Sequence, residues 1–73
     1  MKNEQVMEFW QRRPFQPFDI SVSDGRVYTV DHPDFLARSR GGTFVTYTTE
    51  DDRVIIIDLG HVTALEVSNT HAA

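Results

Sequence analysis

The stretch FDISVSDGRVYTV, residues 18–30, decides the fold of this chain. Apolar and polar side chains alternate from Phe18 to Val22, and a second β-type run follows the Asp-Gly pair that ends at Gly25. Alternation with a period of two is typical of strands with one buried face, and Asp-Gly between two such runs indicates a hairpin. The stretch therefore predicts two antiparallel strands joined by a short turn.

The length of this turn follows from which side chains would face each other. A two-residue loop would place Phe18 opposite Asp31, whereas a three-residue loop places Phe18 opposite Val30. Only the longer loop keeps apolar side chains together, and a slip of one residue would turn every side chain to the wrong face. We therefore expect a three-residue loop over residues 23–25, with Gly25 left-handed in a bulge.

Three more strands are predicted downstream, at residues 43–48, 53–58 and 62–67. The first is β-branched or aromatic throughout, and a brief corner at 59–61 separates the other two. The middle strand is unusual because four consecutive residues are apolar on both faces, namely Val54, Ile55, Ile56 and Ile57. An antiparallel strand with one solvated face should alternate. We expect the N-terminal helix, the curling sheet or a neighbouring subunit to cover both sides of it.

A short helix is predicted ahead of the sheet, at about residues 4–13. Asn3 can cap its N-terminus, and Pro14 ends it. Arg12 and Arg13 would then lie in the last turn, where the helix dipole favours positive charge.

Together these elements predict a mainly β (α+β) fold in a single domain of residues 1–73. The β region covers about residues 17–67, and residues 68–73 are expected to form a frayed tail. The short N-terminal helix is followed by a five-stranded, strongly bent antiparallel sheet, for which we expect a small SH3-like or Sm-like barrel. An open five-stranded sheet with the helix across one face is the alternative.

Composition narrows the classes of function. The chain has no cysteine, which excludes disulfides and thiolate zinc sites. Seven basic against 11 acidic residues give a net charge of −4, which disfavours duplex DNA binding. No apolar run has the length of a signal peptide or a membrane span, so a cytoplasmic protein without membrane contact is expected.

Residues 31–42 connect the two predicted hairpins and contain most of the candidate functional residues. Pro33 favours the first position of a helix or 3₁₀ turn, after which Phe35 and Leu36 would enter the core. The alternative is a metal site at His32, with its carboxylate neighbours and with distant ligands brought near by folding, namely Asp31, Asp34, Asp58 and His61. The spacing matches no metal-binding motif, so we assign no metal ligand.

Arginines in the same segment suggest a second hypothesis. Arg38 and Arg40 precede two flexible glycines and could hold a phosphate, with Arg12 and Arg13 as supporting charge. Tyr47 could provide a stacking face for a base, as could Tyr28 or Phe44. The glycines lack the spacing of a phosphate loop, so the motif is not specific.

No catalytic residue and no cofactor are predicted. Ser39, His32 and Asp31 are the residue types of a nucleophile, a base and an orienting acid, but nothing near Ser39 resembles a nucleophile elbow. A chain of this length also offers little concave volume from which water can be excluded.

Several short strings resemble a family of small bacterial proteins with P-F-x-P-F, D-G-R and H-P-x-F spacing. In this chain they are Arg13–Phe18, Asp24–Arg26, His32–Phe35 and Ile57–Leu59, with Val62-Thr63 after them. The resemblance covers residues 13–67 and implies a bacterial, cytoplasmic protein without implying an activity. The likeness to Sm-like proteins lies in element order only, and it would imply assembly through strand edges and an RNA-binding surface.

The sequence therefore predicts a non-enzymatic small β-barrel interaction module that forms a homo-oligomer through Val54–Ile57, with another protein as a possible partner. One alternative is an Sm-like binder of single-stranded RNA or a nucleotide through Arg38 and Arg40. The second alternative is metal binding through His32.

Overall fold

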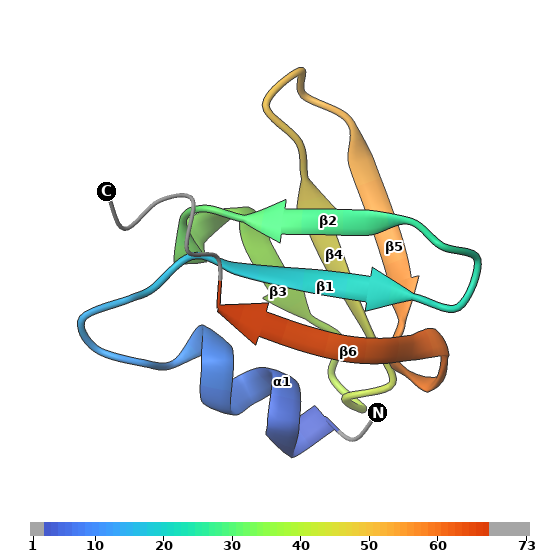
Figure 1. The fold of residues 1–73 in the computed structure, drawn as a ribbon, viewed down its shortest axis with the longest axis horizontal. Helices are drawn as coiled ribbons and strands as arrows, with labels where there is room; N and C mark the ends of the chain where they lie inside the picture. The colour runs from blue at the N-terminus through green and yellow to red at the C-terminus, as the bar shows by residue number, and fades with distance from the viewer. Residues whose placement is uncertain (1–2, 68–73) are drawn as a thin grey trace.

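The computed structural model describes residues 3–67, which form a mainly β domain with a short N-terminal helix (Figure 1). The helical elements are α1 (Asn3–Trp10) and two 3₁₀ turns, η1 (Pro33–Phe35) and η2 (Leu59–His61). The strands are β1 (Phe18–Val22), β2 (Val27–Val30), β3 (Leu36–Arg38), β4 (Phe44–Thr48), β5 (Val54–Asp58) and β6 (Val62–Val67).

The strands form two three-stranded antiparallel sheets. Sheet A has the order β2-β1-β6, and sheet B has the order β3-β4-β5. This confirms the predicted mainly β fold with its N-terminal helix, but differs from a five-stranded barrel in two ways. Residues 3–67 contain six strands, and no strand pairing within that range joins sheet A to sheet B.

The β1–β2 hairpin has the predicted register. Phe18 lies opposite Val30 and Ile20 opposite Tyr28. Gly25 has a φ of 92°, and its N–H donates to the Val22 carbonyl over 3.0 Å. The three-residue loop with a left-handed glycine is thus confirmed.

The strand that the sequence did not predict is β3. It has only three residues, Leu-Ala-Arg, and none of them is β-branched or aromatic. It forms because it pairs with β4, with Leu36 opposite Tyr47 and Arg38 opposite Val45. Pairing with a neighbour, rather than local preference, therefore creates this strand.

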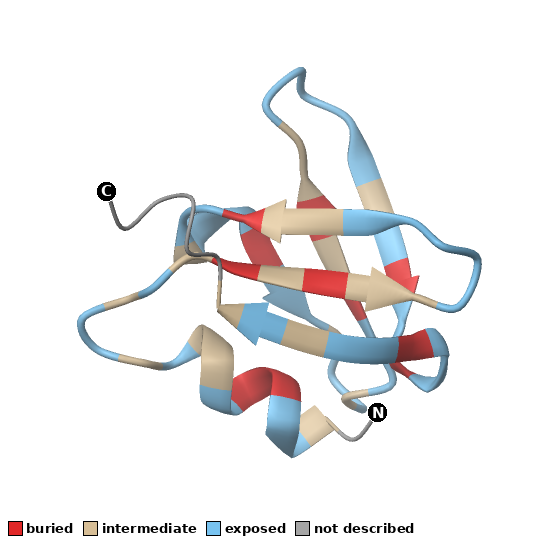
Figure 2. Ribbon diagram, viewed as in Figure 1, coloured by how far each residue is buried: buried red, intermediate tan, exposed pale blue. Residues whose placement is uncertain are grey.

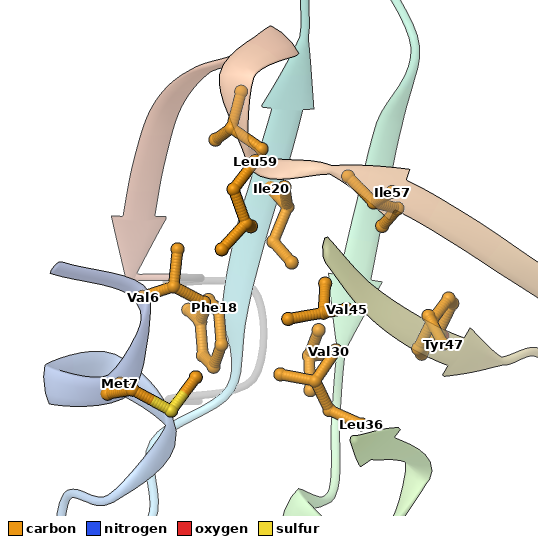
Figure 3. Packing of buried hydrophobic residues seen from close by; sticks show 11 residues of the cluster. Val6, Met7, Phe18, Ile20, Val30, Leu36, Val45, Tyr47, Ile57 and Leu59 are labelled. Carbon is orange, nitrogen blue, oxygen red and sulfur yellow. The ribbon is translucent and has the colours of Figure 1, made fainter. Parts of the chain in front are cut away.

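The core lies between the facing sides of the two sheets (Figures 2 and 3). Figure 3 shows Phe18, Ile20 and Val30 of sheet A converging on side chains of sheet B, and all three are fully buried. Sheet B contributes Leu36, Val45, Tyr47 and Ile57. One face of each sheet is thus apolar and buried, as the alternating pattern requires.

Helix α1 closes one open side between the sheets by burying Val6 and Met7 in the core. At its C-terminal end, the Trp10 indole N–H donates to the Pro33 carbonyl over 2.9 Å. At its N-terminal end, Asn3 lies so close to Gly42 that an added Cβ would be 3.0 Å from the Asn3 side chain. The helix therefore runs beside the segment that contains η1 and β3.

The helix ends three residues earlier than predicted, at Trp10. Pro14 disfavours helical geometry at the residue before it, so Arg12 and Arg13 lie beyond the last turn. Arg13 Nη1 still donates to the Trp10 carbonyl over 3.2 Å and to the Arg12 carbonyl over 2.7 Å. The positive charge thus serves the helix end from outside the helix.

The turn at η1 agrees with the prediction in part. Pro33 begins it, and Leu36 is buried as expected. Phe35 was predicted in the core but is 48% exposed, because the chain turns Leu36 rather than its neighbour inward as β3 starts. The Phe35 ring lies instead beside His32, with ring centroids 5.5 Å apart.

Within residues 3–67, no helix is both long enough and apolar enough to span a bilayer.

Candidate functional site

The outer face of sheet B is the most apolar exposed surface among the described strands. In the β4–β5 pair, Thr46 lies opposite Ile56 and Thr48 opposite Val54, so these four side chains point to the same side. Val54 is 68% and Ile56 67% exposed. Phe44 adds a partly exposed ring at the end of the same face, next to Asp58.

The outer face of sheet A has a different character. Its paired positions place Asp19 between Thr29 and Glu66, and Thr29 Oγ1 donates to Asp19 Oδ1 over 2.7 Å. Val27 is the one large hydrophobic side chain exposed there, opposite Ser21. The apolar exposure is therefore concentrated on one of the two sheets.

The four-residue apolar run is covered on one side only. Ile57 is buried and Ile55 half-buried against the core, whereas Val54 and Ile56 face outward. Helix α1 packs against a different part of the fold and leaves both side chains exposed (Figure 1). The expectation that the helix or the curling sheet covers both sides is wrong for this chain alone.

The backbone of β5 is unpaired on its second side. The Thr49 amide donates to the Arg53 carbonyl over 2.8 Å, and the Leu59 amide donates to the Thr43 carbonyl over 3.0 Å. These two bonds show which residues of β5 are hydrogen-bonded to β4. The backbone N–H and C=O groups of the odd-numbered residues point toward β4. The N–H and C=O groups of Val54, Ile56 and Asp58 point away, to a side where no strand of residues 3–67 pairs.

A cleft of two hollows lies on the side of the fold where β2 crosses in front of the β4–β5 hairpin (Figure 1), and only its first hollow is lined by the free edge of β5. The hollows have volumes of about 390 and 410 Å³ and share Tyr28 as a wall. The first continues along residues 55–58 and reaches His61, and the second continues along β2 to Glu50. We refer to both hollows together as the cleft.

Tyr47 joins the two sheets at the floor of the cleft. Its hydroxyl donates to the Thr29 carbonyl on β2 over 2.6 Å, and its ring centroid lies 6.3 Å from that of Tyr28. Burial raises the pKa of Tyr47, and the negative charges of Asp31 and Glu50 raise it further. Both carboxylates line the second hollow, so that hollow is acidic.

The first hollow carries charge of both signs. Asp24 and Asp58 line it, together with Arg26. The Arg26 guanidinium lies 3.4 Å from Asp24, and its pKa is raised by a hydrogen bond with Tyr28 and by the negative charge of Asp24. With Asp31 and Glu50 in the second hollow, the cleft has four carboxylates against this one paired arginine.

Ser23, His61 and Asp58 meet at the end of the first hollow. Ser23 Oγ lies 3.4 Å from His61 Nδ1, and His61 Nε2 lies 4.0 Å from Asp58 Oδ2. All three are exposed, and Asp58 Oδ1 already accepts from the Gly60 amide over 2.8 Å. The Ser23 amide also donates to the His61 carbonyl over 2.9 Å. This contact ties the β1–β2 turn to η2.

The predicted arginine site is divided in the structure. Arg38 and Arg40 are exposed near the β3–β4 turn, close to the N-terminal end of α1. Arg12 and Arg13 lie past its other end, where Arg12 stacks on the Phe9 ring at 4.5 Å. Tyr47 is buried with its hydroxyl engaged, so it offers no stacking face beside Arg38.

The polar residues of the connecting segment have structural roles. His32 Nδ1 accepts from the Asp34 amide over 3.2 Å and lies 3.7 Å from its carboxylate, which caps η1. Ser39 Oγ accepts from the amides of Thr43 and Phe44. No three His, Asp or Glu side chains among residues 3–67 lie together as a metal ion would require.

Sequence reasoning identified the apolar run but missed the cleft. Tyr28 and Tyr47 belong to different hairpins, and only the crossing of the two sheets brings them together. Asp31 and Glu50 each follow a predicted strand, but no local pattern indicates that they line one hollow.

No family model matches the chain, and no curated protein or solved structure is significantly similar to it.

Proposed function

We propose that this protein is a non-enzymatic interaction module that self-associates through the outer face of sheet B. The observation that carries the proposal is the pair Val54 and Ile56, each about two-thirds exposed on the same face of one strand. Complete burial of such a side chain is worth roughly 1.5–3 kcal/mol relative to full exposure. Binding of a partner to this face would therefore add a burial free energy that the single chain does not have.

A second copy suits this face on electrostatic grounds. Each chain has a net charge of −4, so two copies repel each other in general. The central residues of the outer face, Thr46, Thr48, Val54 and Ile56, are uncharged. Contact at these uncharged residues keeps the charged groups of the two copies apart. A two-fold interface also requires the same patch on both partners, which two identical chains provide.

The order of elements supports a fold assignment beyond the two sheets. A short helix precedes the strands, and a 3₁₀ turn separates the last strand from the one before it. We propose that the domain is an open relative of the SH3-like and Sm-like barrels, with β2 and β3 as two halves of one bent strand interrupted by η1. The fold alone implies no activity.

Sedimentation velocity of the purified protein tests self-association. The wild type should form a discrete oligomer at micromolar concentration, and the double variant Val54→Thr, Ile56→Thr should sediment as a monomer. Threonine keeps the β-branched shape and the strand preference while removing the apolar contact. Val27→Thr on the outer face of sheet A is the matched control, since Val27 is 57% exposed but stands apart from the patch. A wild type that stays monomeric would refute the proposal.

The RNA-binding hypothesis has one supporting observation, the exposure of Arg38 and Arg40. A single-stranded RNA complex of this kind should weaken steeply with salt, and the pair Arg38→Ala, Arg40→Ala should abolish it. Metal binding through His32 would require a ligand set from more than one copy or from outside residues 3–67. We place both below self-association because neither has a surface as well defined as the outer face of sheet B.

A further inference from the structure

We infer that the cleft binds an extended, positively charged peptide segment, which adds a strand to the free edge of β5. This surface shares only Ile56 with the central residues of the outer face of sheet B, and the inference does not depend on self-association. Three features support it: the free strand edge, the apolar floor beside it and the charge of the walls.

The strand edge itself forms one wall of the cleft. Ile55, Ile56, Ile57 and Asp58 all line the first hollow, although side chains of alternate residues point to opposite faces of a strand. Four consecutive residues can line one hollow only if the strand presents its edge to it. The outward N–H and C=O groups of Ile56 and Asp58 are therefore available to an added strand.

This edge lacks the features with which proteins usually protect exposed strands. Proline, lysine, a bulge or a very short strand commonly blocks pairing with another chain. The sequence of β5 is Val-Ile-Ile-Ile-Asp, and its pairing with β4 is regular along all five residues. By contrast, β3 has only three residues, and on β2 the Tyr47 hydroxyl occupies the Thr29 carbonyl. The β5 edge is thus the most open to strand addition among these three.

The floor of the cleft suits the side chains of an extended segment. Tyr28 and Ile55 are half-buried and line the first hollow, and Tyr47 lines the second. In an added strand, every second side chain would lie over this apolar floor. The segment should therefore carry an apolar residue at alternate positions.

The charges of the cleft walls indicate which residues the peptide should carry between its apolar positions. Asp31 and Glu50 line one hollow, and Asp24 and Asp58 line the other, with Arg26 paired to Asp24. Lysine or arginine side chains in the segment would meet these carboxylates, whereas nucleic acid or a second copy of net charge −4 would be repelled. An alternating basic and apolar peptide therefore fits the cleft.

Nuclear magnetic resonance titration with a defined probe tests the inference. The probe is an acetylated and amidated Lys-Val-Lys-Val-Lys-Val peptide, added to the ¹⁵N-labelled full chain. We expect saturable shifts at the amides of Val54, Ile56 and Asp58 and at Tyr28. Three control peptides separate the contributions. One has Glu in place of each Lys and reverses the charge, and two are N-methylated at alternate residues, one in each phase, which removes strand hydrogen bonds. The Glu peptide and one N-methylated phase should fail to bind.

Variants of the protein test whether the carboxylates of the cleft walls contribute to binding. Asp31→Asn with Glu50→Gln should weaken binding of the probe by about three- to tenfold, the effect expected of two partly exposed ion pairs. The matched control is Glu8→Gln with Glu66→Gln, which removes two negative charges from exposed positions outside the cleft lining. It should leave the affinity within about twofold, because charges far from the site are screened.

Three results would overturn the inference: no saturable shift at millimolar probe, equal binding of the Glu peptide, or shifts confined to the outer face of sheet B. So would protection of the Val54 and Ile56 amides that rises with protein concentration alone, since a second copy would then occupy the edge. A Thr46→Glu variant separates the two proposals, because Thr46 lies on the outer face of sheet B opposite Ile56 but lines neither hollow. Like-charge repulsion at that face should make it monomeric, and it should still bind the probe, so either proposal can fail without the other.

Discussion

Tyr47 connects the two sheets through a polar contact. Its ring lies in the core, while its hydroxyl reaches the Thr29 carbonyl at the edge of sheet A over 2.6 Å. This bond satisfies a carbonyl that faces away from β1 and so has no partner in the ladder. A single hydroxyl thus fixes how close β2 lies to β4 beside the cleft.

Removal of that hydroxyl should cost stability. We expect Tyr47→Phe to lower the free energy of unfolding by about 0.5–1.5 kcal/mol, the usual net worth of a protein hydrogen bond. Urea denaturation followed by tryptophan fluorescence measures it through Trp10. Tyr28→Phe is the control, because the Tyr28 hydroxyl interacts with exposed Arg26 and its loss should change stability by less than about 0.5 kcal/mol. Equal losses in both variants would contradict the role assigned to Tyr47.

The same side chain predicts a pH dependence at the alkaline end. Burial, with Asp31 and Glu50, raises the pKa of Tyr47, whereas in the unfolded chain the hydroxyl ionises near pH 10. The stabilising contribution is therefore complete below about pH 10 and is lost as the pH rises through the folded pKa. We expect the stability difference between wild type and Tyr47→Phe to shrink from about pH 9.5 upward, measured by urea denaturation. A constant difference would show that Tyr47 ionises as it does in the unfolded chain.

At the scale of elements, the turn of the β1–β2 hairpin requires a left-handed conformation at one glycine. Gly25 has a φ of 92°, which side chains with a Cβ rarely adopt, although no atom lies within 4 Å of an added Cβ. Gly25→Ala should therefore lower the free energy of unfolding by about 1–2 kcal/mol through backbone strain alone. Gly41→Ala also meets open space but has no positive φ, so it should be neutral or slightly stabilising. If urea denaturation gave both variants a similar loss in free energy of unfolding, the positive φ of Gly25 would not be the cause of the loss.

The elements differ in how well their sequence predicts them. The β1–β2 hairpin was predictable because alternation and the Asp-Gly turn agree on one register. The strand β3 was not, since its three residues acquire their structure only from pairing with β4. The end of α1 was placed too late, because Pro14 restricts the residue before it and the helix stops at Trp10.

The exposed surfaces also differ in how well the sequence predicts them. Val54–Ile57 was recognisable as two-sided from the sequence, but which half remains exposed depends on where sheet A and α1 pack. Arg12 and Arg13 were predicted to support a site at Arg38 and Arg40, whereas the fold places them at the opposite end of α1 from Arg40. Local pattern therefore indicates the residue types of a site, and the crossing of the sheets decides which of them meet.

At the scale of the whole molecule, size limits stability. A chain of 73 residues without cysteine buries only about 60% of its unfolded surface and has no disulfide to compensate. The exposed Val54 and Ile56 therefore represent a large share of the apolar burial still available to the fold. Self-association would turn that surface into stability of the folded state.

If self-association contributes in this way, thermal stability must depend on protein concentration, because a partner that binds only the folded chain shifts the unfolding equilibrium. We expect the melting temperature of the wild type to rise by about 5–11 °C over a 100-fold increase in concentration, because a dimer gains about 1.4 kcal/mol per chain over that range and each kcal/mol shifts a domain of this size by about 4–8 °C. Calorimetry across that range measures it. The melting temperature of Val54→Thr, Ile56→Thr should not depend on concentration, whereas Val27→Thr should keep the wild-type dependence. A wild type whose melting temperature is independent of concentration would mean that the outer face of sheet B adds nothing to folding and serves, if at all, a different protein.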